Sequence, residues 1–212
     1  MSEITKMRDQ IAAFAKSIYD RGLTSGSTGN ISARLSDGTI LMTPTGSSMG
    51  FIDPARISHL SADLLLLSGD TPTKEISLHT AFYDTRSETG AVVHLHSCHS
   101  VALSMMPDTD PEDVIPALTP YPIMRLGKVK LLPFFLPGDP EMGTAVRGLA
   151  GKRSAVLLAN HGPVVAGKDL EASVYAMEEL EEGAKLAMMT RGMERIGLCA
   201  EDLTKLRLKY PA

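Results

Sequence analysis

Three histidines in this 212-residue chain occupy positions where imidazole side chains could bind a metal ion. His94 and His96 are one residue apart in the apolar segment 91–96, and alternate side chains of a strand point to the same face. His161 follows another apolar segment, and Gly162 next to it permits a tight backbone turn. Burying two imidazoles is costly unless a partner satisfies them, and Zn²⁺ binds imidazole readily. A hydrogen-bonded pair of sheet histidines would give the same pattern, so both interpretations stay open on spacing alone.

The other three histidines and the two cysteines have no comparable setting. We expect His59, His79 and His99 at the surface or behind the site, with His99 as the best helper because it closely follows the paired histidines. Cys98 is expected to be buried and inert. Cys98 and Cys199 are far apart and form no CxxC pair, which fits a reducing cytosol better than a secreted protein.

Two loops rich in small residues, 25–30 and 45–48, could bind an anion. Successive backbone N–H groups in such loops can form an anion-binding concavity. Thr73 and Lys74 would add a hydroxyl group and a cation. Neither loop matches a GxxxxGK[ST] or a GxGxxG motif, so nucleotide binding is unsupported. Ordinary turns have the same composition, and the residues alone leave both interpretations open.

The elements that must position these residues alternate between helices and strands. Apolar residues at helical spacing predict helices over 4–18, 75–86 and 170–188, the last with a solvated face of glutamates at 178–182. Short apolar or alternating segments predict strands at 31–35, 39–43, 64–67, 91–96, 129–135, 154–159 and 164–165, with 64–67 buried. Several turns are short enough for hairpins. We therefore predict an α/β fold with three layers, in which helices cover a mixed, mainly antiparallel central sheet.

The composition is that of a globular protein with a real core. Hydrophobic residues make up 43% and charged residues 22% of the chain, which excludes a disordered or collagen-like protein. A net charge of −4 lacks the excess of positive charge that favours binding to nucleic acid or to an anionic membrane. No apolar run approaches the roughly 18 residues that span a bilayer, and residues 1–20 do not resemble a signal peptide. The sequence predicts one cytoplasmic domain over residues 1–212, with no nucleic-acid or membrane partner.

Five short motifs, in this order, resemble the class II aldolase/adducin family, whose familiar enzyme is L-fuculose-phosphate aldolase. They are Thr28-Gly-Asn-Ile-Ser32, Thr43-Pro-Thr-Gly46, Thr73-Lys-Glu75, His94-Leu-His96 and Asn160-His-Gly162. The resemblance runs from about residue 3 to about residue 192. It implies a single Zn²⁺ ion, or another divalent metal, in each subunit, bound by His94, His96 and His161. In the same family the residue that matches Glu75 is both a metal ligand and the acid/base.

The resemblance also assigns roles to the loops and to one tyrosine. The matching loops hold the substrate phosphate, here through Gly29, Asn30, Thr45, Gly46, Thr73 and Lys74. Relatives are homotetramers with active sites between subunits, in which a tyrosine donates a proton to a neighbouring site. Tyr121, between Pro120 and Pro122, matches that region, and a packing role is the alternative.

Within the family, three further segments are similar to the 3-oxo-tetronate 4-phosphate decarboxylases. They are Pro72-Thr-Lys-Glu75, Leu118-Thr-Pro-Tyr121 and Pro137-Gly-Asp-Pro140, whereas fuculose-type aldolases typically have Ser-Ser-Glu at 73–75. This similarity implies a zinc-dependent lyase that converts a small phosphorylated keto acid to dihydroxyacetone phosphate and CO₂ through a metal-stabilised enediolate. One alternative is aldol cleavage of a sugar phosphate, giving dihydroxyacetone phosphate and an aldehyde. Another is a non-catalytic adducin-like interaction module, against which the complete set of histidines and Glu75 argues.

Overall fold

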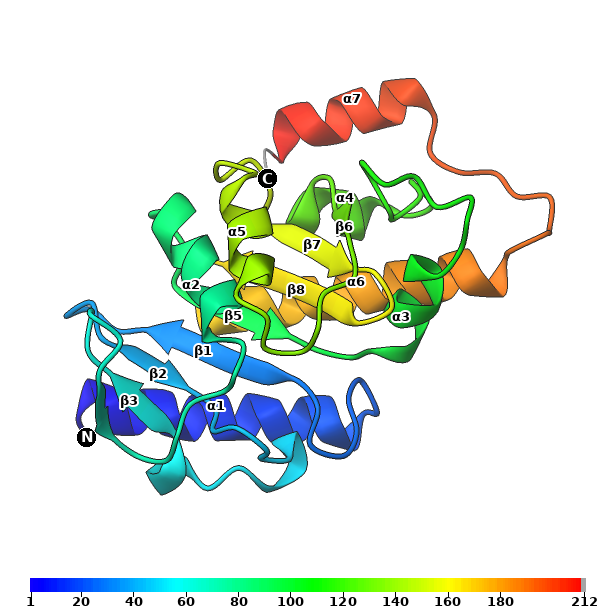
Figure 1. Ribbon diagram of the computed structural model, residues 1–212. Coiled ribbons are helices and arrows are strands. Elements are labelled where there is room, and N and C mark those ends of the chain that lie inside the picture. Colours follow the sequence, from blue (N-terminus) through cyan, green and yellow to red (C-terminus); the bar gives the residue numbers. More distant parts are fainter. Residues whose placement is uncertain (211–212) are drawn as a thin grey trace.

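A single eight-stranded sheet with helices on both faces forms the centre of the molecule (Figure 1). The computed structural model describes residues 1–210. The strand order is β4-β3-β2-β1-β5-β8-β7-β6, and neighbouring strands are antiparallel except for the parallel pair β6–β7. The predicted three-layer architecture with a mixed, mainly antiparallel sheet is therefore confirmed.

The predicted helices and strands occur in the predicted order. The strands are β1 (Asn30–Arg34), β2 (Ile40–Met42), β3 (Ser58–Leu60), β4 (Leu66–Ser68), β5 (Ala91–His94), β6 (Lys130–Leu132), β7 (Ala155–Leu158) and β8 (Gly162–Gly167). The α-helices are α1 (Glu3–Asp20), α2 (Ile76–Thr85), α3 (Cys98–Ser104), α4 (Pro120–Leu126), α5 (Glu141–Arg147), α6 (Leu170–Met189) and α7 (Ala200–Lys209). The structure adds β3, α3, α4, α5 and α7, which the sequence analysis did not predict. Two short 3₁₀ helices, η1 (Met49–Phe51) and η2 (Pro54–Arg56), connect β2 to β3. No helix in this described part of the chain has both the length and the apolar character needed to cross a membrane.

The two faces of the sheet belong to two separate hydrophobic cores. On one face, Ile31 and Val93 pack in a cluster with Ile11 of α1 and Val174 of α6. On the other face, a cluster of strand residues includes Val92 and packs against α2 and α5. Adjacent residues of β5 thus enter opposite cores, as the alternation of side chains along a strand requires. In Figure 1, α1 and α6 accordingly lie behind the sheet, whereas α2 and α5 lie in front.

Strand β4 departs from the prediction. The leucines at 64–67 were expected to form a buried strand, but they are between 39% and 67% exposed. The strand itself is displaced to Leu66–Ser68 and forms one edge of the sheet, where it pairs only with β3. The expectation of burial was wrong because an apolar run indicates a strand without specifying its place in the sheet.

The pairing of the central strands brings distant segments of the chain together. Asn30 of β1 lies opposite His94 of β5, and His94 lies opposite Val164 of β8. The chain reverses direction between β7 and β8 within the three residues 159–161. Asn160 permits this tight turn by adopting a positive φ of 55°. This turn places His161 at the same end of the sheet as His94.

Gly162 is required by the close approach of this turn to the segment after β5. A Cβ atom at position 162 would lie 2.1 Å from the backbone carbonyl oxygen of Leu95 and 3.2 Å from the Cα of His96. Because the nearest atom belongs to the backbone, it cannot swing aside as a side chain would. The glycine therefore allows His161 to approach His96.

We expect Gly162→Ala to lower the free energy of unfolding by about 1–3 kcal/mol, the usual cost of overpacking. Urea denaturation measures this change. Gly148→Ala is the matched control, because Gly148 has a helical φ of −59° and its Cβ would have only one contact as short as 3.3 Å. Equal stability of the Gly162→Ala variant and the wild type would contradict this account of the turn.

Candidate active site and metal centre

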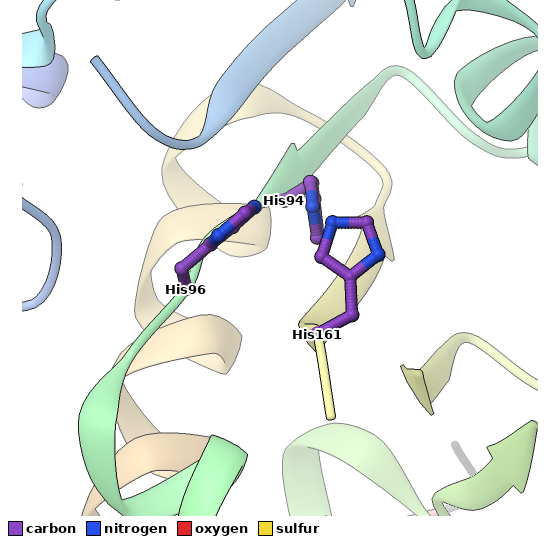
Figure 2. A group of neighbouring side chains, drawn as sticks. All are labelled: His94, His96 and His161. Atoms are coloured by element: carbon purple, nitrogen blue, oxygen red, sulfur yellow. The ribbon is translucent and has the colours of Figure 1, made fainter. Parts of the chain in front are cut away.

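The three predicted histidines converge at one end of the central strands (Figure 2). His94 ends β5, His96 follows two residues later, and His161 comes from the β7–β8 turn. One ring nitrogen from each lies within 4.8 Å of the others. The ring centroids are 4.7 to 5.0 Å apart. Such spacing allows all three imidazoles to bind one metal ion.

The hydrogen bonding of the rings matches that of metal ligands. Nδ1 of His94 donates a hydrogen bond to the carbonyl oxygen of Pro163 at 2.8 Å. The proton of the neutral ring is therefore on Nδ1, and the lone pair of Nε2 faces the cluster. This Nε2 atom and both ring nitrogens of His161 are buried without a hydrogen-bond partner in the protein. Buried polar atoms normally have partners, and metal-bound imidazoles typically donate their other nitrogen to a carbonyl. The residues present therefore fit a metal ion.

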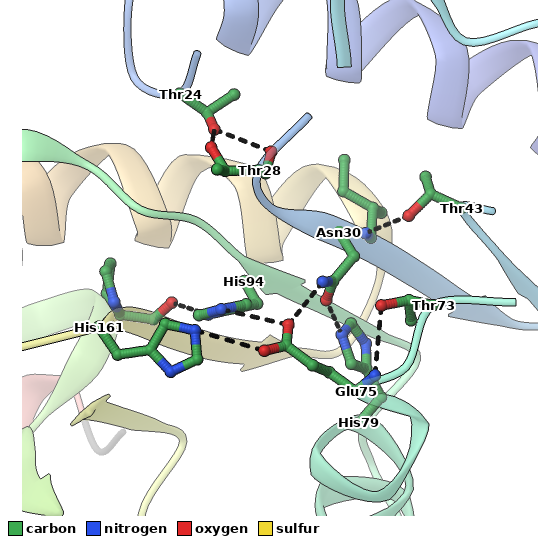
Figure 3. A network of polar contacts seen from close by, with 11 residues as sticks. Thr24, Thr28, Asn30, Thr43, Thr73, Glu75, His79, His94 and His161 are labelled. Atoms are coloured by element: carbon green, nitrogen blue, oxygen red, sulfur yellow. Dashed lines mark hydrogen bonds and ion pairs between the residues drawn. The ribbon is translucent and has the colours of Figure 1, made fainter. Parts of the chain in front are cut away.

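Glu75 completes the cluster from the start of α2 (Figure 3). Its Oε2 atom lies 3.4 Å from Nε2 of His94, and its Oε1 atom lies 3.3 Å from Nε2 of His161. The side chain of Asn30 donates a hydrogen bond to Oε2 at 2.7 Å. Glu75 is only 6% exposed. The carboxylate is thus placed to serve either as a fourth metal ligand or as an acid/base beside the metal.

The protonation states of these groups also suit metal binding. Burial lowers the pKa of His94, and it lowers the pKa of His96 to about 4 with help from the neighbouring histidines. Burial of Glu75 opposes its ionised form, but the close imidazoles of His161 and His94 and the hydrogen bond from the Asn30 amide together hold the pKa of Glu75 below its usual range. Near neutral pH His94 and His96 are therefore unprotonated and Glu75 is ionised, the forms that bind metal.

A pocket of about 230 Å³ opens directly beside this cluster. Four segments and His96 form the wall of this pocket, and one of the segments contributes Glu75. The lining residues are 27–30, 44–47, 73–75, 137–138 and His96. All six residues predicted to bind phosphate line this pocket. The structure thus brings the two anion-loop candidates and the metal candidates into a single site.

Two of the predicted phosphate residues have contacts that the sequence did not suggest. Both ends of the Asn30 side-chain amide are already engaged, one with Glu75 and the other with His79. Lys74 packs under the loop at Gly138, where a Cβ atom would lie 3.1 Å from the Cβ of Lys74. Gly138 has a φ of +85°, so the loop reaches this close contact in a backbone conformation that favours glycine.

His79 lies behind the site, one of the two places expected for it, whereas His99 and Cys98 differ from the expectations. His79 is completely buried and contacts Asn30, so it lies directly behind the site. Its position four residues after Glu75, on the same face of α2, was the signal that could have identified it. His99 binds Glu181 rather than any residue of the cluster. Cys98 is exposed rather than buried, since it begins α3 at the surface.

Glu181 was expected on a solvated face of the last long helix, and this interpretation was wrong. Its carboxylate accepts hydrogen bonds from the backbone N–H groups of His99 and Ser100, each at 2.9 Å. These are donors at the start of α3 that have no partner within that helix. Glu181 therefore joins α6 to α3 and holds in place the segment that follows His96.

Tyr121 is not brought into the pocket of its own chain. It is the second residue of α4, it is 53% exposed, and it is absent from the pocket wall. Its assignment as a proton donor for another subunit stays a prediction.

A layered fold with three histidines and one glutamate beside a pocket defines an α/β protein whose side chains could hold a metal ion. The model of the family "Class II Aldolase and Adducin N-terminal domain" matches residues 9–188, and the chain belongs to this family. The 3-oxo-tetronate 4-phosphate decarboxylase of Escherichia coli K12 is 44% identical to it, over 98% of this chain and 100% of that protein.

A solved structure and an aldolase sequence are also similar to this chain over most of its length. The crystal structure of Escherichia coli YgbL, described as an aldolase/epimerase/decarboxylase, superposes with a TM-score of 0.94 at 42% identity and covers 97% of this chain and all of that one. The L-fuculose phosphate aldolase of Methanocaldococcus jannaschii is 33% identical over 86% of this chain and 96% of its own. The resemblance predicted from the five motifs is therefore confirmed.

We expect His96→Ala to abolish binding of a divalent metal while the fold remains intact. His96 is half-buried and supplies one imidazole to the cluster, whereas its removal leaves both hydrophobic cores unchanged. Inductively coupled plasma mass spectrometry gives the metal content, and circular dichroism gives the fold. His59→Ala is the control, because His59 bonds to Thr39 and lies outside the cluster. Stoichiometric metal in a folded His96→Ala protein would refute the assignment.

Proposed function

We propose that this protein is a zinc-dependent carboxy-lyase that converts a 3-oxo-tetronate 4-phosphate to dihydroxyacetone phosphate and CO₂. The carrying observation is that an anion pocket containing Lys74 adjoins the cluster of three histidines and Glu75. This arrangement lies in a chain 44% identical to the Escherichia coli decarboxylase over nearly its full length. One part of the site then holds the phosphate while the other acts on the opposite end of a four-carbon substrate.

The choice of zinc rests on the donor set. Three imidazole nitrogens and a carboxylate are ligands typical of Zn²⁺, although other divalent metals accept the same ligands. When bound, the metal ion acts as a Lewis acid that stabilises negative charge on the ketone and neighbouring hydroxyl oxygens of the substrate. His94, His96 and His161 would hold it, with Glu75 as an additional ligand before substrate binds.

The protein's own part in the reaction centres on proton transfer. When the bond between the carboxyl carbon and C2 breaks, its electron pair moves toward the C3 ketone oxygen. C2 must then take up a proton to give dihydroxyacetone phosphate, and this proton comes from solvent by way of an acid/base group that first binds it. Glu75 is the acid/base candidate at this position, because its carboxylate is buried beside the histidines and faces the pocket.

The phosphate would lie at the other end of the pocket. Gly29, Thr45 and Gly46 belong to loops rich in backbone donors, and Thr73 contributes a hydroxyl group. Lys74 adds a positive charge at the pocket wall. Asn30 can offer its second amide proton, because only one is used by Glu75. Binding energy from this remote group would position the reacting carbons.

Assembly and location form part of the same proposal. We assign a homotetramer in which Tyr121 serves a neighbouring subunit, since this tyrosine is half exposed and lies outside its own pocket. A small phosphorylated substrate and two unpaired, exposed cysteines suit a cytoplasmic enzyme. Nucleic acid and membranes are not partners in this proposal.

Aldol cleavage of a sugar phosphate is the second candidate. It is favoured by the 33% identity to the Methanocaldococcus jannaschii aldolase and by the shared need to stabilise charge beside a ketone. The Thr73-Lys74-Glu75 segment, in place of the Ser-Ser-Glu typical of the aldolases, supports decarboxylation instead. A non-catalytic module is disfavoured because the buried, unpartnered ring nitrogens would then have no use.

We expect the purified protein to release CO₂ from a 3-oxo-tetronate 4-phosphate and to leave L-fuculose 1-phosphate intact. Coupled assays for CO₂ and for dihydroxyacetone phosphate measure both reactions. The unphosphorylated 3-oxo-tetronate should react with a lower kcat as well as a higher KM, because remote phosphate binding aligns the reacting carbons. Faster cleavage of the aldolase substrate would replace the decarboxylase proposal with the aldolase one.

We expect Glu75→Gln to keep most of its bound metal but to lose kcat by about 100-fold or more, the usual contribution of a general acid/base. Glutamine preserves the shape and can still accept the hydrogen bond from Asn30, but it cannot carry the proton. Steady-state CO₂ release, with metal content measured in parallel, tests this. Glu201→Gln is the control, since that carboxylate is exposed on α7. Near-normal turnover by Glu75→Gln would remove Glu75 from the mechanism.

A further inference from the structure

A chain of buried polar side chains extends from Glu75 away from the pocket, behind the site. The amide of Asn30 donates to Glu75, and its oxygen contacts Nε2 of His79 (Figure 3). On the other side of the His79 ring, Nδ1 lies 2.7 Å from the hydroxyl oxygen of Ser32. That oxygen in turn lies 2.8 Å from the hydroxyl of Tyr83. Four hydrogen bonds thus connect Tyr83 to the carboxylate of the site.

This chain is built from one strand and one helix. Asn30 and Ser32 are two residues apart on β1, and His79 and Tyr83 are four residues apart on α2. Each pair therefore points in one direction, and the two rows meet between the sheet and the helix. His79 and Ser32 are completely buried, while Asn30 and Tyr83 are 6% and 7% exposed. Solvent has little opportunity to substitute for any of these hydrogen bonds.

The hydrogen bond from the Asn30 amide nitrogen to Oε2 of Glu75 fixes the direction of the other hydrogen bonds in the chain. A carboxylate can only accept, so the amide nitrogen of Asn30 faces Glu75 and the amide oxygen faces His79. His79 must then carry its proton on Nε2. Because His79 is buried and neutral, its Nδ1 atom accepts from the hydroxyl group of Ser32. The oxygen of Ser32 is left to accept from Tyr83.

We propose that His79, Ser32 and Tyr83 are positioning residues that hold the Asn30 amide, and through it the Oε2 atom of Glu75, in one orientation. The inference rests on the proposed function, because it assigns Glu75 the acid/base role. Anchoring Oε2 leaves Oε1 as the oxygen that is free to exchange a proton with the substrate. An amide held on one side only could rotate and release the carboxylate.

The protonation pattern can be tested without substrate. We expect ¹⁵N NMR of the zinc-loaded protein to show one histidine wholly in the Nε2–H form, with a slowly exchanging proton. This signal should be missing from His79→Gln. His94 should show the opposite form, since its Nδ1 donates to Pro163. An Nδ1–H form of His79, or a mixture of both forms, would overturn the proposed direction of the chain.

The positioning role can be tested by kinetics. We expect His79→Ala to lower kcat by about 10- to 100-fold with little change in KM, as removal of residues that orient a metal or its ligands usually does. His79→Gln should recover part of the loss, because its amide can still donate to Asn30. Tyr83→Phe, which removes only the last hydrogen bond, should lower kcat by a smaller factor. Tyr19→Phe is the matched control, because Tyr19 packs against Phe51 outside this chain.

The outcomes separate this inference from the proposed function. If the wild-type protein releases no CO₂, the proposed function fails, and the NMR result still decides how Asn30 is held. If the wild type is active but His79→Ala and Tyr83→Phe both keep the wild-type kcat, the positioning role fails. An unfolded His79→Ala protein leaves Tyr83→Phe and the wild-type NMR signal to decide. A loss of kcat that glutamine does not recover at all would also contradict the donor role of His79.

Discussion

A buried carboxylate held beside three histidines is the constraint around which this molecule is arranged. Glu75 is almost completely buried, and burial alone would favour its neutral form. Its charge is tolerated because Asn30 donates to one oxygen and His161 lies beside the other. The central strands, the β7–β8 turn and the start of α2 must all meet at one point to provide these neighbours. A buried charge lacking them would be strongly destabilising.

The sequence contained enough information for most of the fold and for the metal candidates. Alternation in the strands and helical spacing in α1, α2 and α6 are local signals, and they predicted elements close to those observed. The spacing of His94 and His96 alone predicted that they share one face, although β5 ends at His94. Their approach to His161 and Glu75 depended on pairing between distant strands, so the motif resemblance, rather than periodicity, connected them. All six phosphate candidates line one pocket for the same reason.

What the sequence could not predict was the environment of individual side chains. The leucines at 64–67 have the composition of a buried strand, yet β4 lies at the edge of the sheet. Glu181 belongs to a run of acidic residues that resembles a solvated face, yet it caps α3. The only sequence signal for His79 was its position four residues after Glu75, and its contacts form only where β1 packs against α2. In each case the deciding contact lies far along the chain, beyond the reach of local pattern.

The residues that meet at Glu75 lie far apart along the chain, and this separation has a consequence for how the protein would acquire a metal ion. Asn30, Glu75, His94 and His161 come from four separate segments, joined by the pairing of β1, β5 and β8. No short peptide from this chain contains the complete set of ligands, and an unfolded chain would bind metal weakly. A metal ion bound by these side chains would therefore stabilise the native state selectively, and more strongly as its free concentration rises. Retention of the metal ion would then show that β1, β5 and β8 are still paired. Local separation of these central strands would release the ion before the helices unfolded.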